Sequence, residues 1–348
     1  MTLTEAPIFV GIGGDSGSGK STLAAAFYDL FGAERITTIC LDDYHSLDRR
    51  ERALVSLTPL NPRANDFATM EEQVWALKRG EAVQKPVYDH SDGTFKEPEW
   101  LEPNEVVIVQ GLHPFLVPGV REAFDLKVWL DPDPELRLAW KLQRDVAKRG
   151  YNEGQVQAEI EARRPDAEKY INPQRQHADL IVRFYPPKPE HRDMGHLNVR
   201  VVERHTLPRL SFDQNLHDGE MLNFQLDVVD EDGRKSDVFD IDGRIPPEKA
   251  AAIENTVWTH AKELHEHLHR VRPDELGAFD SPLKRRGHSD PLALTQLILA
   301  HRIMSAQKSL LVRVSDKSIV AGNRHGETLT MQPQDNGENL MVQTGEAG

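Results

Sequence analysis

A glycine-rich run near the N-terminus, GIGGDSGSGKST at residues 11–22, fits the pattern G-x-x-x-x-G-K-[ST]. Glycines let several backbone N–H groups turn toward one anion, in conformations that a Cβ would block. In such a loop Lys20 reaches the β- and γ-phosphates of a nucleotide, and the Ser21 hydroxyl binds Mg²⁺. A glycine-rich turn without a ligand is the alternative, but a β-rich run precedes the loop and a helical one follows it, as the motif requires. The predicted ATP-binding residues are Gly14, Asp15, Ser16, Gly17, Ser18, Gly19, Lys20, Ser21 and Thr22.

A second group of reactive residues follows the next apolar run, in the stretch CLDDYHSLDRR. It places Asp42 and Asp43 at the predicted carboxyl end of a parallel strand, where ligands bind in open α/β sheets. A kinase that acts on an alcohol needs a carboxylate to accept the hydroxyl proton as the phosphoryl group moves. We predict that Asp42 has this role. Alternatively, both carboxylates only cap a loop or a helix.

A third group lies in the predicted helix WKLQRDVAKRG at residues 140–150. Lys141, Arg144 and Asp145 stand at i, i+3 and i+4 and therefore share one helix face. A substrate with its own phosphate needs cations beyond those that bind ATP. The candidates for this task are His45, Arg49, Lys141, Arg144 and Arg149. An ordinary solvated helix face with an Arg–Asp pair is the alternative.

The first half of the chain alternates apolar, β-rich runs with helical patterns, and these elements must position the three groups. The strand-like runs are PIFVGIGG, ITTICLD, EVVIVQGL, LKVWLDP and ADLIVRFYP. Helical periodicity covers residues 21–31, 69–79 and 134–149. This alternation predicts an α/β fold with a mostly parallel central sheet flanked by helices. With the glycine-rich loop and the proposed proton acceptor, the predicted fold is that of a P-loop kinase. We expect this nucleotide-binding core to span residues 1–190.

Beyond residue 190 the pattern changes to successive strands followed by helices. Strands are predicted at LNVRVVER, MLNFQLDVV and SDVFDIDG, with an Asp-Gly hairpin turn between the last two. Helices are expected over residues 247–270 and 291–306, followed by a last strand at SLLVRVSD. We predict a C-terminal extension of antiparallel strands and helices over residues 191–320, and a disordered tail over 321–348.

Composition limits the classes of partner. The 348 residues are 39% hydrophobic, which suffices for one large or two moderate domains with a core. A formal net charge of −14 disfavours nucleic acid and anionic membranes as partners. We find neither a signal-like N-terminus nor an apolar run that could span a membrane, and expect a cytoplasmic protein. Cys40 is the one cysteine, which excludes an intramolecular disulfide.

The sequence resembles the phosphoribulokinase and uridine kinase family, and more closely its plant and cyanobacterial phosphoribulokinases. The matching segments are DSGSGKST at 15–22, ICLDDYHSLDR at 39–49, NPRANDF at 61–67, KPVYDH at 85–90, GLHP at 111–114 and WKLQRDVAKRG at 140–150. The resemblance is strong to about residue 186 and weaker beyond it. It implies ATP-dependent phosphorylation of the 1-hydroxyl of D-ribulose 5-phosphate to D-ribulose 1,5-bisphosphate, a step of the Calvin cycle of carbon fixation, by a homodimer.

The resemblance also assigns roles to individual residues. It places Arg144 and Asp145 in the active site, and it lets Lys141 and Arg149 bind the sugar phosphate or the transferring group. Tyr88 and His90 match the family's acceptor-site pair; on their own, each would more often be a loop residue that packs locally.

Two further segments leave alternatives open. The charged segment RGYNEGQVQAEIEARRPDAEKYI, near residues 150–172, is predicted to be a lid over ATP, with a surface helical pair as the alternative. Arg63 either contacts substrate or donates a hydrogen bond to its own loop. His265 and His269 stand at i, i+4 and could bind zinc, but a solvated helix face is the better interpretation because no motif supplies a third ligand.

The chain departs from the family pattern at two places. Gln110 stands where the family usually has an acidic residue, so its place in the Mg²⁺ site is uncertain. Plant members carry a redox-regulatory cysteine pair, and here the first position is Ser18 while the second remains as Cys40. We therefore expect no intramolecular thiol–disulfide switch. The alternatives to a phosphoribulokinase are a uridine kinase, a related small-molecule kinase, or a non-catalytic nucleotide-binding regulator.

Overall fold

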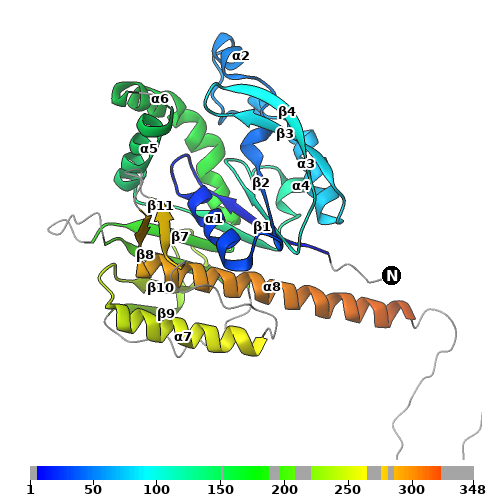
Figure 1. The fold of residues 1–348 in the computed structure, drawn as a ribbon, viewed down its shortest axis with the longest axis vertical. Coiled ribbons are helices and arrows are strands. Elements are labelled where there is room, and N and C mark those ends of the chain that lie inside the picture. Colours follow the sequence, from blue (N-terminus) through cyan, green and yellow to red (C-terminus); the bar gives the residue numbers. More distant parts are fainter. Residues whose placement is uncertain are drawn as a thin grey trace, which may run out of the picture. The chain divides into compact units, whose positions relative to one another are not determined.

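The computed structural model describes residues 6–149, 152–187, 196–207, 221–264, 276–280 and 286–322. Its centre is an eight-stranded sheet with the strand order β2-β5-β1-β6-β7-β8-β10-β9 (Figure 1). The five parallel strands are β1 (Ile8–Gly13), β2 (Ile36–Cys40), β5 (Val106–Gln110), β6 (Leu126–Leu130) and β7 (Leu180–Tyr185). Three strands continue the sheet in antiparallel fashion, namely β8 (Asn198–Arg204), β10 (Lys235–Ile241) and β9 (Leu222–Val229). The predicted α/β fold with a parallel core and antiparallel later strands is confirmed.

Helices and turns connect these strands. They are α1 (Lys20–Phe31), α2 (Arg49–Leu54), α3 (Phe67–Lys78), α4 (Pro118–Arg121), α5 (Pro134–Arg149), α6 (Glu153–Asp166), α7 (Pro247–Leu264) and α8 (Asp290–Gly322). Short 3₁₀ turns lie at Leu41–Tyr44, Pro62–Ala64 and Asn172–His177, and one π turn lies at Ala167–Ile171. Two small hairpins pair β3 (Val83–Asp89) with β4 (Thr94–Leu101) and β11 (Ala278–Asp280) with β12 (Arg286–His288).

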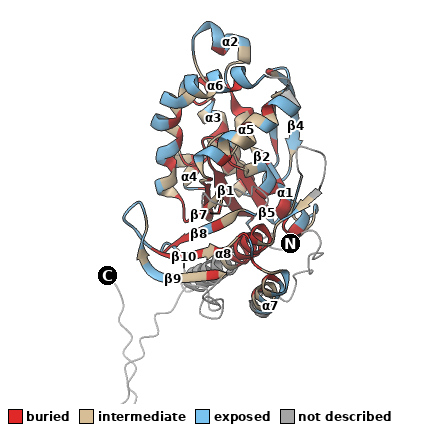
Figure 2. Ribbon diagram, turned by 90° about the vertical axis from the view of Figure 1, so that its left-hand side faces the viewer, coloured by how far each residue is buried: buried red, intermediate tan, exposed pale blue. Residues whose placement is uncertain are grey.

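The core explains why the parallel strands are continuous apolar runs. All six residues of β1 are buried, because helices cover both faces of a parallel sheet. On one side Phe9 and Val107 belong to the same buried cluster as Met70, Val74 and Leu77 of α3. Figure 2 shows the buried strands in red at the centre, with exposed residues concentrated on the surrounding helices and hairpin.

Two secondary-structure predictions need correction. The strand expected at SLLVRVSD, residues 309–316, is helical, because α8 runs from Asp290 to Gly322. After Pro291 no proline or glycine occurs before Gly322, so nothing in the sequence ends the helix earlier. The β3–β4 hairpin was not predicted. Six of the eight β4 residues are exposed and the strand contains Pro98, so it lacks the alternating apolar pattern of a half-buried strand.

The chain divides into a compact unit, Met1–Lys308, and a second unit, Ser309–Gly348, of which residues 309–322 are helical. The predicted tail beyond residue 322 lies outside the described residues, as do His265 and His269. The predicted helix over 247–270 is described to Leu264 as α7. Among the described helices, none is both long and apolar enough to cross a membrane.

Candidate active site

The carboxyl edge of the parallel sheet brings the reactive groups together. Ile12, Cys40 and Gln110 are aligned in register at the ends of β1, β2 and β5. The glycine-rich loop, residues 14–19, follows β1 directly, and the turn containing Asp42 follows β2. Figure 1 shows α5 and α6 on one side of this edge, and α3 with the β3–β4 hairpin on the other. The predicted groups therefore surround one end of the central strands.

The glycine-rich loop has the backbone of an anion cradle. Gly14, Gly17 and Gly19 have φ angles of 147°, 85° and 95°. Residues with a side chain rarely adopt these angles. A Cβ on Gly14 would lie 2.6 Å from Ser18 Oγ and 2.7 Å from the Leu130 carbonyl oxygen. Helix α1 starts at Lys20 without a side-chain cap, so its first N–H groups remain available to an anion. This backbone is compatible with the predicted phosphate cradle.

Lys20 is drawn into this loop. Its ammonium donates hydrogen bonds to the carbonyl oxygens of Gly14, at 2.8 Å, and Asp15, at 2.9 Å. Burial lowers the pKa of Lys20, while the negative charges of Asp42 and Asp15 oppose this shift. The ammonium is thus within the cradle, where it can bind nucleotide phosphate oxygens.

A pair of oxygens beside the cradle suits a hard divalent cation. The Ser21 hydroxyl, in the first turn of α1, donates a hydrogen bond of 3.3 Å to Gln110 Oε1 at the end of β5. A hydroxyl and an amide carbonyl are both ligands that Mg²⁺ accepts. Neighbouring Thr22 is exposed on the same turn. The residues present therefore fit a Mg²⁺ site with two neutral protein ligands, completed by phosphate oxygens and water.

Asp42 and Asp43 have different environments. Asp42 Oδ1 accepts a hydrogen bond of 2.9 Å from the Leu112 N–H. Burial alone would raise the pKa of Asp42, but the Lys20 ammonium and the Leu112 N–H together hold it below its ordinary value. Asp42 is therefore a carboxylate at neutral pH and can accept a proton.

Asp43 instead anchors the β3–β4 hairpin. Its side chain forms a 2.6 Å ion pair with Lys85, which also pairs with Glu99 at 3.0 Å. The second oxygen of Asp43 accepts a hydrogen bond of 3.1 Å from the Tyr88 N–H. The contacts of Asp43 with Lys85 and with the Tyr88 N–H are buried, so Asp43 is the structural member of the pair.

The β3–β4 hairpin carries the predicted acceptor-site residues, with Tyr88 on β3 and His90 directly after it. Tyr88 packs edge-on against His45, with ring centroids 4.8 Å apart, and against His90 at 5.1 Å. His45 Nδ1 is hydrogen-bonded to Asn65 Oδ1 at 2.8 Å. Burial lowers the pKa of His45 to about 4, so its imidazole is neutral at physiological pH. Neutral His45 is a hydrogen-bonding group rather than a cation for phosphate.

Arg49 and Arg52 tie helix α2 to this hairpin. The Arg49 guanidinium donates to the His90 carbonyl oxygen at 2.7 Å, and its backbone N–H donates to the Gly93 carbonyl oxygen. Arg52 is buried, donates to the Tyr88 hydroxyl at 2.7 Å and lies over the Tyr88 ring. The sequence interpretation missed Arg52. Its position three residues after Arg49, on the same helix face, was the available signal.

Helix α5 contributes a network of charges beside the cradle. Asp145 is fully buried and accepts hydrogen bonds from Lys141 Nζ and Arg144 Nε, both at 2.8 Å. Burial opposes ionisation, but Arg144 and Lys141 hold the pKa of Asp145 at about 2. Arg144 also donates to Ser16 Oγ at 3.1 Å. The predicted shared helix face is thereby directed at the loop rather than at solvent.

Other members of this region complete its description. Arg137 of α5, which sequence reasoning missed, forms an ion pair with Asp15 of the loop. Arg149 is the last residue of α5, and its side chain lies outside the described part of the chain. Arg63 is exposed, and among the described residues its guanidinium has no hydrogen-bond partner that would make it a donor to its own loop. The structure leaves its contact with substrate a prediction.

Helix α6, within the predicted lid, is connected to both sides of the site. Glu159 pairs with Lys141 at 3.4 Å and with Arg163. At the end of α6, Asp166 accepts hydrogen bonds from Thr58 Oγ1 at 2.7 Å and Asn61 Nδ2 at 3.2 Å. The segment is a helical pair with α5, and its action as a lid remains a prediction.

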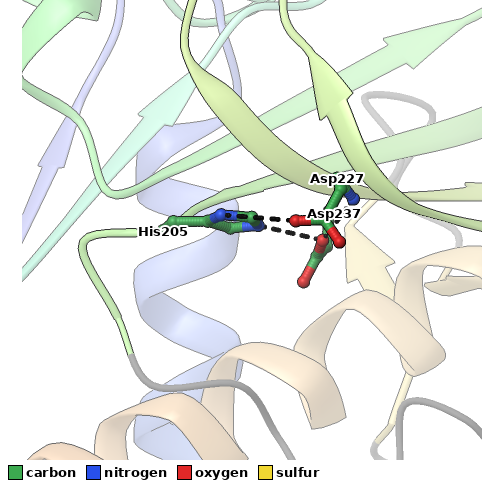
Figure 3. A group of neighbouring side chains, drawn as sticks. All are labelled: His205, Asp227 and Asp237. Atoms are coloured by element: carbon green, nitrogen blue, oxygen red, sulfur yellow. Dashed lines mark hydrogen bonds and ion pairs between the residues drawn. The ribbon is translucent and has the colours of Figure 1, made fainter.

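A separate cluster with metal-ligand chemistry lies elsewhere on the sheet. His205, Asp227 and Asp237 gather where β8, β9 and β10 meet (Figure 3), and β10 is four strands along the sheet from β1. His205 Nε2 lies 3.0 Å from Asp237 Oδ1, which also accepts a hydrogen bond from the Asp227 N–H. The His205 and Asp237 side chains are thus hydrogen-bonded to each other, Asp227 Oδ1 lies 3.9 Å from His205 Nδ1, and the cluster takes no part in the site above.

Comparison with known proteins gives the family. The model of the phosphoribulokinase/uridine kinase family matches residues 9–189, which is more than half of the chain and includes all the residues described at the carboxyl edge of the parallel strands. The chain belongs to this family. Sequence and site therefore agree on a family of kinases, as the resemblance predicted.

Members of the family differ in their similarity to this chain. Phosphoribulokinase of Synechocystis is 45% identical over 204 residues, which is 58% of this chain and 61% of that protein. Chloroplastic phosphoribulokinase of Spinacia oleracea is 40% identical over 57% of this chain and 54% of its own length. Uridine kinase of Alkaliphilus metalliredigens is 32% identical over 51% of this chain and 86% of its own length. The match thus covers less than two thirds of the length of these two phosphoribulokinases.

A solved structure supports the fold. Phosphoribulokinase from Rhodobacter spheroides is 17% identical, with a TM-score of 0.54 over 87% of this chain and 99% of that one. At this identity the likeness concerns the fold alone. It covers most of the chain, and this agrees with a single sheet that continues from the family core into β8, β10 and β9.

Proposed function

We propose that this family member is a phosphoribulokinase that uses Mg²⁺ and ATP to phosphorylate the 1-hydroxyl of D-ribulose 5-phosphate. The observation that carries the proposal is the meeting of an ionised Asp42 with the Lys20 cradle and the cationic face of α5 at one sheet edge. The higher identity to phosphoribulokinases than to a uridine kinase supports the choice of acceptor.

In the proposed reaction the 1-hydroxyl oxygen forms a bond to the γ-phosphorus of ATP. The bond from that phosphorus to the β–γ bridging oxygen breaks, ADP leaves, and the hydroxyl proton passes to Asp42. Lys20 turns from the loop carbonyls to the phosphates, and Arg144, already bonded to Ser16, offsets charge on the transferring group. Mg²⁺ held near Ser21 and Gln110 would supply further charge neutralisation at the phosphates.

The remaining charged groups suit a phosphorylated acceptor. Lys141 and Arg149 on α5 and Arg49 beside the hairpin are the cations proposed to bind the sugar phosphate. Lys141 is now paired with Asp145 and Glu159, so we propose that substrate exchanges for the weaker partner, Glu159 at 3.4 Å. Tyr88, His90 and neutral His45 are proposed to contact the sugar.

We further propose that a homodimer carries out this reaction and that no intramolecular disulfide regulates it. The residue in the cradle is Ser18, and Cys40 is the one thiol of the chain. Burial, with the negative charges of Asp42 and Asp43 nearby, raises the pKa of Cys40. The side chain therefore stays in the thiol form, which is less reactive than the thiolate.

An acceptor comparison tests the proposed function. Purified protein with Mg-ATP would be given ribulose 5-phosphate, uridine or no acceptor, and ADP release would be followed. Release that depends on ribulose 5-phosphate supports the proposal. Release that depends on uridine instead would identify a uridine kinase, and absence of acceptor-dependent release would favour a nucleotide-binding regulator.

A further inference from the structure

His113 occupies a turn that is fixed directly against the proton acceptor. The preceding Leu112 donates its N–H to Asp42 at 2.9 Å. Gln174 clamps the turn from the other side, because its Nε2 donates to the Leu112 carbonyl oxygen at 2.8 Å and its Oε1 accepts from the Phe115 N–H at 2.9 Å. The backbone of His113 is therefore held in a defined position relative to Asp42.

The imidazole of His113 is buried, and its ring nitrogens lack well-formed hydrogen bonds among the described residues. The residue is 3% exposed, and its ring packs edge-on against Phe67 with a centroid distance of 5.5 Å. Neither Nδ1 nor Nε2 has a hydrogen-bond partner of good geometry among the described residues. A buried polar group without a partner is costly, so such a group in a native protein calls for a partner outside the chain, such as water, an ion or a ligand.

The charged groups that influence the His113 ring belong to the region proposed to bind the acceptor. The charged groups that act on His113 most strongly are Asp42, Asp166 and Lys20, which belong to the proton acceptor, the end of α6 and the phosphate cradle. Burial lowers the pKa of His113 to about 4, although Asp42 and the nearby Pro59 carbonyl oppose the shift. At neutral pH the ring thus has one N–H donor and one nitrogen acceptor.

This chemistry selects the class of group that His113 can bind. A phosphate dianion is best bound by a cation, which neutral imidazole is not. A hydroxyl both donates and accepts a hydrogen bond, so it can pair with either nitrogen of a neutral ring. A sugar hydroxyl close to the one that reacts fits the position next to Asp42.

We propose that His113 is a specificity-determining residue that hydrogen-bonds a secondary hydroxyl, on C3 or C4, of the sugar-phosphate acceptor. The inference rests on the proposed function, since it needs a polyhydroxylated acceptor. A site built to bind a hydroxyl discriminates strongly against an analogue that lacks it, because its buried polar atoms are then left unpaired. His113 accordingly favours acceptors with a hydroxyl at that position.

The test combines variants of the protein with deoxy acceptors. His113→Phe removes the polar atoms and His113→Gln retains a donor and an acceptor. Each is assayed with ribulose 5-phosphate and with its 3-deoxy and 4-deoxy analogues. We expect His113→Phe to lower kcat/KM for ribulose 5-phosphate by about 10- to 100-fold with the KM for ATP unchanged, and His113→Gln to recover part of the loss. The loss should not add to that caused by one of the deoxy analogues, since both remove the same bond.

His177 provides a matched control. It is part-buried, its Nε2 lies 2.9 Å from Arg121 Nη1, and it is outside the proposed machinery, so His177→Gln should leave kcat/KM unchanged. Normal kcat/KM in His113→Gln and His113→Phe, or additive losses with both deoxy analogues, would overturn the inference while the proposed function stands. If His113→Phe does not fold, the pattern of His113→Gln with the two analogues decides. Failure of the wild-type protein to phosphorylate ribulose 5-phosphate would overturn both proposals.

Discussion

At the scale of single residues, neighbouring carboxylates acquire different roles from their surroundings. Asp42 was predicted as the proton acceptor, but no local feature of the sequence distinguishes its environment from that of Asp43, because both follow the same strand and both suit a cap or a base. The structure separates them through Lys85, which neutralises Asp43, and through Lys20 and the Leu112 N–H, which keep Asp42 ionised. Partners this far apart in the chain leave no local pattern from which they could be predicted.

This division gives a paired prediction. Asp42→Asn should fold normally and lower kcat by about 10²- to 10⁴-fold, because no carboxylate remains to accept the proton. Asp43→Asn should instead lower the free energy of unfolding by about 1–3 kcal/mol, since Lys85 retains Glu99 as a partner. Steady-state kinetics and thermal unfolding of both variants provide the measurement. Equal kinetic losses with equal stabilities in the two variants would contradict the assignment.

Compared with the acidic residue that is usual in the family, Gln110 is predicted to weaken Mg²⁺ binding without abolishing it. Gln110→Glu places a carboxylate 3.3 Å from Ser21 Oγ and should lower the Mg²⁺ concentration for half-maximal activity by about 10-fold. Gln110→Ala, which removes the oxygen altogether, should raise that concentration. Titration of activity with Mg²⁺ at fixed ATP would measure both. No change in either variant would mean that Gln110 does not face the metal.

At the scale of elements, the sequence predicts the parallel strands from their apolar runs. It does not reveal a strand whose residues are charged and exposed. Strand β1 is buried throughout and β5 is buried at all positions except Gln110, and both were predicted from their composition. The β3–β4 hairpin was missed because its outer strand is exposed, yet it carries Tyr88 into the site. The same limit explains why α8 was taken to end early, since its β-branched residues resemble a strand when seen without their context.

Helix α6 gives the prediction at this scale. Asp166 holds the end of α6 to Thr58 and Asn61 across the site. Asp166→Ala should let the helix drift, lower kcat/KM by about 10- to 100-fold and raise ATP hydrolysis without acceptor, since closure excludes water. Thr58→Val removes one of the two bonds and should have a smaller effect. An Asp166→Ala protein with normal kinetics in both assays would contradict a lid role for α6.

At the scale of the whole molecule, one sheet links the nucleotide-binding core to the later strands. The order β7-β8-β10-β9 extends the sheet away from the cradle, and buried Arg302 of α8 pairs with Glu203 of β8. The hairpin and strand patterns of the sequence predicted these antiparallel strands. The strand order could not be predicted, because it depends on pairing between segments that are distant in the chain.

Redox behaviour is predicted for the whole molecule as well. With Ser18 in the cradle and Cys40 without a partner in the chain, kcat should be the same under oxidising and reducing conditions for monodisperse protein. Cys40→Ser should behave identically in both. A reversible oxidative loss in the wild-type protein that disappears in Cys40→Ser would contradict the prediction and indicate an intermolecular bond.

The most direct test of the central claim identifies the product. The protein would be incubated with Mg-ATP and ribulose 5-phosphate labelled with ¹³C at C1, and the mixture followed by ³¹P and ¹³C NMR beside the Asp42→Asn variant. The account predicts a second phosphomonoester signal coupled to the labelled carbon, formed together with ADP and absent in the variant. Release of inorganic phosphate with the labelled carbon unchanged, or equal product formation by Asp42→Asn, would contradict it.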